Sequence, residues 1–362
     1  MAIRMEADTL VQNCTILHVT DKRIIRDGVI AIKDSKIAYV GEKATAPKIT
    51  AEKIIDAQGK VAMPGLINCH THLAMTLFRG VAEDQPLNTW LTETIWPLEA
   101  KLQPRDVYNG ALLGCLEMIK TGTTTFADMY YHEGQVAKAV EKAGLRAVLT
   151  QGTIEMGDPK IGEKTLKNSI NFATKYNGYA DGRITTRLGP HAVYTCSPEL
   201  LTKVRDVASK LNLGIHIHLA ESKEMTEQMR QKHSFTEVEL LEKIGFLGPD
   251  VLAAHCIHLT KKEMMVLATH DVKVAHNPVA NMKLAQGIAK VKDLRDLGLT
   301  VGLGTDGPAS NNTLDMFETM KIATLLQKLT YRNPTLLSAY EALRMATIDG
   351  ARAVGIEKNA GS

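Results

Sequence analysis

The feature that most constrains the fold is an alternation of short apolar runs with amphipathic stretches, which begins near residue 61 and continues to the end of the chain. Parallel strands need long crossover connections, and a helix usually supplies them. Eight strand–helix units are the number that closes a (β/α)₈ barrel, so we predict that fold. The expected strands are residues 61–67, 123–128, 145–150, 184–189, 214–218, 251–255, 272–276 and 300–305.

Residues before this alternation have a different pattern. They contain short strand-like runs with tight turns, and Asp34-Ser35 is a hairpin-like turn between the runs 28–33 and 36–41. The sequence therefore predicts two domains: a small antiparallel β module at residues 1–59 and a barrel domain at residues 60–362.

Bulk composition excludes several classes of protein. A formal net charge of +3, with both signs mixed along the chain, argues against a nucleic-acid or membrane-surface partner. No apolar run approaches the length of a membrane span, and the N-terminus carries acids early without a signal-like apolar core, so we expect a cytoplasmic protein. The five cysteines are scattered without a C-x-x-C, which argues against disulfides and against a cysteine-bound zinc site.

A pair of histidines ends the first expected barrel strand. His70 and His72 stand one residue apart after the apolar run, and residues i and i+2 of a strand point to the same face. Both imidazoles can therefore aim at one point. We predict a metal-ligand pair.

Three later strand ends also carry ligand-type residues. These are His218, His255 and Asp306. Active sites of such barrels lie at the C-terminal ends of the strands, so one metal centre at that rim is expected. His218 is nearer that end than His216, so we assign His218 as the ligand and His216 as a supporting or core residue.

Other polar residues near these strand ends could take part in chemistry. Glu221 is suited to shuttle a proton, although an acid there would equally suit the start of a helix. His255 is suited to act as a base or as an electrostatic stabiliser beside a metal-bound water. His191 follows the fourth strand and is a candidate for substrate binding. His276 is interpreted as pocket lining or structural.

A glycine pattern overlaps the last of these segments. Gly302-x-Gly304-x-x-Gly307 fits the dinucleotide-binding fingerprint. We reject that function because no parallel strand with a terminal acid follows it. The glycines are expected instead to let groups crowd around the site.

Taken together, these segments resemble the amidohydrolase superfamily. The resemblance is carried by the segments 64–72, His218-Leu219-Ala220-Glu221, His255-Cys256-Ile257-His258-Leu259, 276–284 and Gly304-Thr305-Asp306-Gly307, and it covers nearly the whole chain. Within the superfamily, the sequence looks like the deaminases of methylthioadenosine, S-adenosylhomocysteine and 5′-deoxyadenosine.

The resemblance implies roles for individual residues. It implies that His70, His72, His218 and Asp306 bind one divalent metal ion per subunit, zinc first, although this ligand set also accepts iron, manganese or cobalt. Catalysis would fall to Glu221, His255 and Asp306. Substrate would be bound by Glu99, which follows the tryptophan-rich segment after the first strand, by His191 and by Glu221.

The implied reaction is hydrolytic deamination of an adenosine-type nucleoside at C6. Metal-bound hydroxide would add at C6, and the products would be the inosine analogue and ammonia. The partner is thus a small molecule, and a homo-oligomer, dimer or tetramer, is expected. Two alternatives stay open: a deaminase or chlorohydrolase of guanine, cytosine or a triazine on the same fold, and a non-catalytic metal-binding scaffold.

The chain departs from its relatives in two places. Some of them have an arginine where Gln151 precedes Gly152, and that arginine helps to bind the distal part of the substrate. The relatives also continue beyond Ser362 with strands that complete the small β module. We therefore expect this module to be an incomplete β-sandwich.

Overall fold

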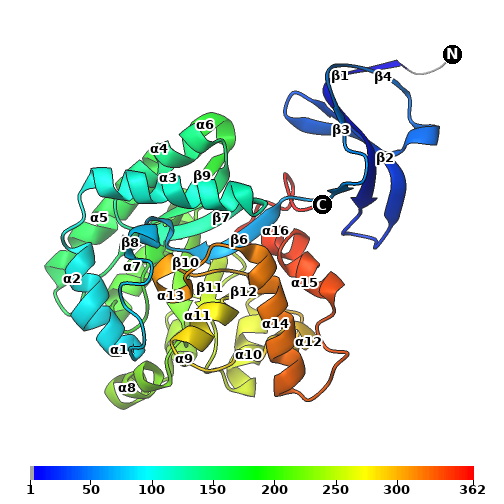
Figure 1. The fold of residues 1–362 in the computed structure, drawn as a ribbon. Helices are drawn as coiled ribbons and strands as arrows, with labels where there is room; N and C mark the ends of the chain where they lie inside the picture. Colours follow the sequence, from blue (N-terminus) through cyan, green and yellow to red (C-terminus); the bar gives the residue numbers. More distant parts are fainter. Residues whose placement is uncertain (1–3) are drawn as a thin grey trace. The chain divides into compact units, whose positions relative to one another are not determined.

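The computed structural model describes residues 4–362, with residues 232 and 233 described by their backbone only. The chain divides into two compact units, residues 4–64 together with Ser362, and residues 65–361 (Figure 1). None of the described helices combines the length and the apolar character that crossing a membrane requires.

The first unit is a single five-stranded sheet. Its strands are β1 (Arg4–Leu17), β2 (Ile24–Lys33), β3 (Lys36–Glu42), β4 (Lys48–Asp56) and β5 (Val61–Ala62), with the short 3₁₀ helix η1 (Lys43–Thr45) before β4. The order is β3-β2-β1-β4, and β5 also pairs with β1. Asp34 and Ser35 both have positive φ, so the predicted tight turn between β2 and β3 is confirmed.

One expectation for this unit needs correction. β2 runs antiparallel to β1, but β4 and β5 run parallel to it, so the sheet is mixed rather than antiparallel. Within residues 4–64 all five strands belong to one sheet, which agrees with the expected incomplete sandwich. The long connection between β1 and β4 is taken up by β2 and β3, which allows the chain to return in the same direction.

The second unit contains eight parallel strands, each hydrogen-bonded to its neighbour in the chain. They are β6 (Leu66–Thr71), β7 (Thr123–Tyr130), β8 (Arg146–Thr153), β9 (Ile184–Pro190), β10 (Gly214–Leu219), β11 (Val251–His255), β12 (Lys273–His276) and β13 (Val301–Leu303). The predicted barrel is confirmed. The predicted strand 61–67 is wrong in its bounds, since Pro64 has no N–H to give and the chain breaks there between β5 and β6.

The first and last barrel strands are joined by a side chain. Asn68 on β6 donates to the Thr305 hydroxyl at 2.7 Å and accepts the Thr305 N–H at 3.0 Å. Just beyond, the Asp306 N–H donates to the His70 carbonyl at 2.9 Å. This seam brings Asp306 beside His70.

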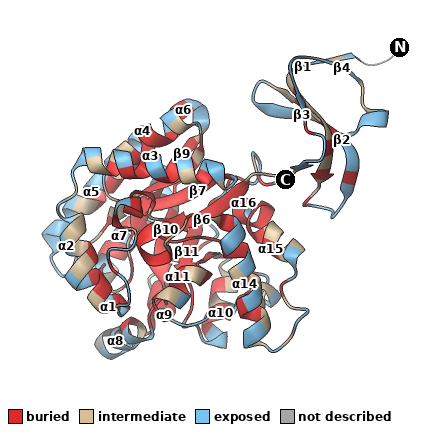
Figure 2. Cartoon of the chain, viewed as in Figure 1, coloured by how far each residue is buried: buried red, intermediate tan, exposed pale blue. Residues whose placement is uncertain are grey.

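Helices surround the strands and keep their outer faces in solvent, while the strands are buried (Figure 2). An apolar layer that includes Leu73, Phe126, Val136 and Leu149 separates β6–β8 from the helices that cover them. The helical elements are η2 (Leu73–Phe78), α1 (Leu87–Thr89), η3 (Trp90–Ile95), α2 (Trp96–Glu99), α3 (Pro104–Lys120), α4 (Glu133–Ala143), α5 (Pro159–Tyr176), α6 (Tyr179–Gly182), α7 (Pro198–Leu211), α8 (Lys223–His233), α9 (Glu237–Lys243), α10 (Lys261–Thr269), α11 (Pro278–Lys283), α12 (Val291–Asp296), α13 (Pro308–Asn311), α14 (Met316–Thr330), α15 (Ala339–Met345) and α16 (Ile348–Val354).

Candidate active site

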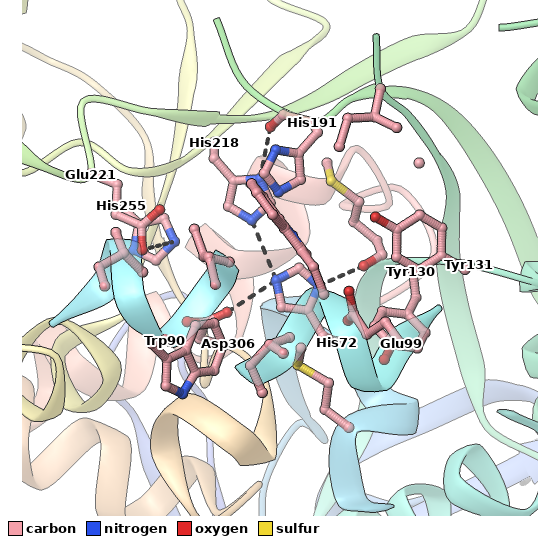
Figure 3. Close-up of a pocket in the computed structure, with 18 of the residues that line it drawn as sticks. His72, Trp90, Glu99, Tyr130, Tyr131, His191, His218, Glu221, His255 and Asp306 are labelled. Atoms are coloured by element: carbon pink, nitrogen blue, oxygen red, sulfur yellow. Dashed lines mark hydrogen bonds and ion pairs between the residues drawn. The ribbon is translucent and has the colours of Figure 1, made fainter. Parts of the chain in front are cut away.

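Four side chains converge at the C-terminal ends of the barrel strands. Asp306 Oδ1 lies 3.3 Å from His70 Nε2 and 3.2 Å from His72 Nε2. His218 Nε2 lies 3.3 Å from His72 Nε2. These are the four residues predicted as metal ligands, and Figure 3 shows three of them, His72, His218 and Asp306, meeting at one point.

The other ring nitrogen of each histidine is occupied. His72 Nδ1 lies 2.5 Å from the Met129 carbonyl, and His218 Nδ1 lies 2.8 Å from the His191 carbonyl. A carbonyl can only accept, so both Nδ1 atoms carry a proton, and Nε2 is the atom of each ring that can take a metal ion or a second proton. His70 Nδ1 is paired instead with His216 Nε2 at 2.9 Å, which agrees with the supporting role predicted for His216.

This arrangement fits a cation. Two imidazole lone pairs that face each other at 3.3 Å repel unless a proton or a metal ion lies between them. His70 Nε2 and Asp306 Oδ1 are buried without a hydrogen-bond partner among the described residues. His70, His72 and His218 each offer a ligand atom within 4.8 Å of the others, as do His70, His255 and Asp306. Imidazole and carboxylate donors suit zinc and similar divalent metals.

The pKa values of the cluster also indicate that it favours a bound cation. Burial lowers the pKa of His70 to about 4, so this ring is neutral and free to be a ligand. Burial also disfavours charge on His72, but the Asp306 carboxylate outweighs it and raises the pKa of His72 to about 9. The Asp306 carboxylate thus attracts positive charge to this point, which either a proton or a metal ion can supply.

Glu221 and His255 lie beside the cluster. His255 Nε2 is 3.7 Å from Glu221 Oε1, and His255 Nδ1 is 2.9 Å from Asn281 Oδ1. Burial raises the pKa of Glu221 above its ordinary value. Both residues were predicted as catalytic, and the structure brings them to the same rim as Asp306.

The backbone at this rim takes unusual conformations. Ala220, His255 and Asp306 all have positive φ, which is uncommon for residues other than glycine. The turn at Ala220 is held by Glu237, whose carboxylate accepts the Ala220 N–H at 3.0 Å, and by the Ile257 N–H, which donates to the Ala220 carbonyl. Such conformations concentrate at functional sites, where surrounding contacts maintain them.

A cavity opens above the cluster. It encloses about 680 Å³ of space not filled by atoms, part of it open to solvent. All of the predicted site residues except His70 line it, and the His70 ring lies against the His72 ring, with the ring centroids 4.9 Å apart. Figure 3 shows Glu221 and His255 on one side of His72, and Glu99, Tyr130 and Tyr131 on the other. The full lining is His72, Met75, Leu87, Trp90, Leu91, Ile95, Trp96, Glu99, Met129, Tyr130, Tyr131, Gly152, Thr153, Ile154, His191, Tyr194, His218, Glu221, His255, Leu284 and Asp306.

The tryptophan-rich segment after β6 forms one wall of this cavity. Trp90 and Trp96 come from η3 and α2, and Glu99 ends α2. Burial raises the pKa of Glu99 to about 7, while the nearby Tyr130 hydroxyl and His72 act in the opposite direction. A mostly apolar cavity with a few convergent polar groups is the usual form of a small-molecule site.

Some features of the site differ from, or go beyond, the sequence predictions. His276 is fully buried but does not line the cavity, so of its two predicted roles the structural one remains. Asn281 and Ser310 were not predicted, although they hold His255 and Asp306. Tyr130 was also missed. It ends β7, and an aromatic residue at the C-terminal end of a barrel strand could have indicated it.

The glycine pattern has the steric role that was expected. A Cβ atom on Gly304 would lie 2.3 Å from Asn277 Oδ1 and 2.9 Å from the backbone nitrogen of His70. On Gly307 it would lie 3.2 Å from His72 Cβ. These positions must lack a side chain for the segment after β13 to lie against the end of β6.

Comparison with known proteins identifies the family. Residues 61–362 match the model of the amidohydrolase family. The chain is 50% identical to a 5′-deoxyadenosine deaminase of Methanosarcina acetivorans over 352 residues, which is 97% of this chain and 81% of that relative. It is 49% identical to a 5-methylthioadenosine/S-adenosylhomocysteine deaminase of Pelotomaculum thermopropionicum, with the same coverage.

Solved structures agree with the sequence comparisons. An adenosine deaminase from Xanthomonas campestris with bound zinc has a TM-score of 0.95 and 30% identity, over 99% of this chain and 83% of that one. A triazine hydrolase has a TM-score of 0.90 and 25% identity, over 98% and 83%. By its family match, its relatives and its barrel with a histidine-rich rim, the chain belongs to the amidohydrolase family.

Proposed function

We propose that this protein hydrolyses adenosine-type nucleosides at C6 and releases ammonia and the inosine analogue. The observation that carries the proposal is the arrangement of one cavity, in which Glu221 and His255 flank the histidine cluster and Glu99 stands on the opposite side. The purine ring would lie beside Glu221 and His255, and its ribose would lie beside Glu99. The names of the relatives at about half identity support 5′-deoxyadenosine, methylthioadenosine, S-adenosylhomocysteine and adenosine as the substrate class.

We propose that His70, His72, His218 and Asp306 hold one divalent metal ion per subunit. Zinc is our first choice because a solved neighbour contains it, and iron, manganese and cobalt suit the same donors. When bound, such an ion acts as a Lewis acid and makes water acidic enough to ionise near neutral pH. The protonated Nδ1 atoms of His72 and His218 fix the orientation of both rings for this purpose.

The acids and bases around the cavity would move the protons. Glu221 has a raised pKa, so it is more readily protonated than an exposed glutamate and can donate to a ring nitrogen of the purine. Asp306 and His255 would accept the proton of the attacking water. The Ser310 hydroxyl donates to Asp306 Oδ2 at 2.7 Å, which leaves Oδ1 directed toward the histidines.

Glu99 and His191 would bind the rest of the nucleoside. Glu99 can accept hydrogen bonds from ribose hydroxyl groups, and His191 lines the same cavity. His191 Nδ1 is 3.1 Å from the Thr195 hydroxyl, so its Nε2 atom is the one available to substrate. These two residues favour a nucleoside over a free base or a triazine.

Ammonia release from a panel of compounds tests the proposal. The purified protein, loaded with zinc, should release ammonia from at least one of 5′-deoxyadenosine, methylthioadenosine, S-adenosylhomocysteine and adenosine, and removal of the metal by a chelator should abolish this activity. Guanine, cytosine and an amino-triazine serve as comparison substrates. Faster ammonia release from one of these, or chloride release from a chloro-triazine, would establish the alternative substrate class. Tight metal binding with neither ammonia nor chloride released from any compound would favour a non-catalytic scaffold.

The remaining expectations stay predictions. They are a homo-oligomer, dimer or tetramer, cytoplasmic residence, and the assignment of residues 1–59 to a small β module and residues 60–362 to the catalytic domain. All of the residues that the proposed mechanism uses lie after residue 60.

A further inference from the structure

A buried glutamate that does not line the cavity holds the turn that precedes Glu221. Glu237 is the first residue of α9. Its Oε2 atom accepts the Ala220 N–H at 3.0 Å, and its Oε1 atom accepts the hydroxyl of Thr226, which lies on α8, at 3.1 Å. The Glu237 side chain therefore joins the end of β10 to both of the helices that follow it.

The start of α9 does not need this glutamate. An acid in the first turn of a helix usually complements the helix dipole. Here Thr236 and Glu239 already form a capping box, in which each side chain accepts the backbone N–H of the other residue. The Glu237 carboxylate is instead bonded to Ala220, 17 residues earlier in the chain. A buried carboxylate is costly unless it is hydrogen-bonded, so the groups that it holds explain its presence.

The turn at Ala220 depends on such contacts. Ala220 has a φ of 49°, in the left-handed region that a Cβ atom disfavours. Its N–H is held by Glu237, and its carbonyl accepts the N–H groups of Ile257 and His258 at 3.0 Å and 2.9 Å. Contacts from two other segments of the chain therefore maintain this conformation.

The same turn sets the direction of the Glu221 side chain. Glu221 directly follows Ala220, and the next residue, Ser222, is already the N-cap of α8. The segment that bonds to the Ala220 carbonyl directly follows His255 and Cys256. Glu221 Oε1 lies 3.7 Å from His255 Nε2, as Figure 3 shows. The backbone contacts of Ala220 therefore fix these two side chains relative to each other.

We propose that Glu237 is a positioning residue for deamination: by accepting the Ala220 N–H, it holds the left-handed turn that directs Glu221 into the cavity. This inference rests on the proposed function, in which Glu221 donates a proton to the purine. Glu237 lies outside the cavity lining and acts through Glu221. A shift of about 1 Å in a reacting group can lower a rate by on the order of 100-fold.

Steady-state ammonia release by the metal-loaded full-length protein tests the inference. Glu237→Met keeps the length of the side chain and removes both acceptor oxygens, and Glu237→Ala replaces it if the methionine variant is not recovered folded. We expect kcat for the most active nucleoside of the panel to fall by about 10–100-fold, with KM within about threefold of wild type and metal content unchanged. Glu237→Gln retains an acceptor for Ala220, and its amide can donate to Thr226, so kcat should return to within about threefold of wild type.

A double variant separates positioning of Glu221 from a general loss of structure. In a Glu221→Gln protein the acid is already absent, so the addition of Glu237→Met should lower kcat by less than about threefold further. Glu239→Met is the matched control, because it removes a carboxylate that accepts a backbone N–H at the same end of α9, that of Thr236 at 3.1 Å. We expect Glu239→Met to lower the melting temperature and to keep kcat within about twofold of wild type.

Each contrary result has its own meaning. Wild-type kcat in Glu237→Met, or an equal loss of kcat in Glu239→Met, would overturn the positioning role. A Glu237→Gln protein as impaired as Glu237→Met would show that the acceptor for Ala220 is not what matters. A further loss above about threefold in the double variant, or a loss of metal from Glu237→Met, would show that Glu237 does not act through Glu221. A wild-type protein that releases no ammonia from any compound would instead overturn the proposed function.

Discussion

The histidine cluster and the Arg187 side chain differ in how their buried polar groups are paired. At the C-terminal rim, His70 Nε2, His255 Nε2 and Asp306 Oδ1 are buried without a hydrogen-bond partner among the described residues. Near the starts of β10 and β11, the buried guanidinium of Arg187 donates to the carbonyls of Ile215 and Asp250, at 3.2 Å and 2.9 Å.

This difference distinguishes polar groups that bind a ligand from polar groups that stabilise the fold. A buried polar atom without a partner costs about 1–3 kcal/mol, so several of them at one point indicate that a ligand completes the site. A buried cation that donates to backbone carbonyls instead ties neighbouring strands together. The rim should therefore govern activity, and the opposite end should govern the free energy of unfolding.

The largest expected effect is at the rim. Glu221→Gln keeps the size of the side chain and removes its acid, so kcat for deamination should fall by about 10²–10⁴-fold. Metal content and the free energy of unfolding should stay near their wild-type values, because Glu221 is not one of the four proposed ligands. Steady-state kinetics, metal analysis and urea unfolding measure the three quantities.

A nearby glutamate provides the control for this variant. Glu224 lies on α8 three residues further on and is exposed, so Glu224→Gln should be as active as wild type. A Glu221→Gln protein that deaminates at the wild-type rate would show that another group supplies the proton to the purine.

The opposite end of the barrel should respond in the reverse manner. Arg187→Ala removes charge-assisted hydrogen bonds to two strands and leaves a cavity, so the free energy of unfolding should fall by about 2–4 kcal/mol. KM and metal content should not change, since Arg187 lies away from the rim. Urea unfolding at constant metal concentration measures the loss.

Arg205→Ala is a suitable comparison for this variant. Arg205 pairs with the Asp250 carboxylate at 2.6 Å, but the pair is partly exposed, and such pairs contribute about 0–1 kcal/mol. If Arg187→Ala proved as stable as Arg205→Ala, the cost of burying the guanidinium would cancel its hydrogen bonds, and the assignment of stability to this end would be wrong.

The sequence allowed prediction of those parts of the molecule that follow from local pattern. Eight apolar runs were enough to locate the eight barrel strands, and ligand-type residues at four strand ends were enough to locate the histidine cluster. Parallel strands place their C-terminal ends at one rim, so residues as distant as His70 and Asp306 could be expected to meet.

Features that depend on contacts between distant residues were not predictable in this way. Nothing local in the sequence indicates that Asn68 joins β6 to the segment after β13, or that Asn281 holds His255. The break at Pro64 was missed because apolar residues continue on both sides of it. The parallel pairing of β4 with β1 was missed because strand direction depends on where the intervening strands β2 and β3 lie, and the residue pattern of a single strand does not show this.

The smallest expected effect concerns Glu99, which distinguishes the ribose side of the rim from its catalytic side. Its pKa is raised to about 7, so its carboxylate form increases as the pH rises through 7. A carboxylate accepts hydroxyl hydrogen bonds more strongly than the neutral acid, by about 1 kcal/mol, so KM for adenosine should fall about fivefold between pH 6 and pH 8.

2′,3′-Dideoxyadenosine lacks both hydroxyls, and its KM should not show this fall, which separates Glu99 from other groups that titrate in the same range. Glu99→Gln should remove the difference between the two substrates. A pH dependence that is the same for both substrates in the wild-type protein would show that Glu99 does not contact the ribose.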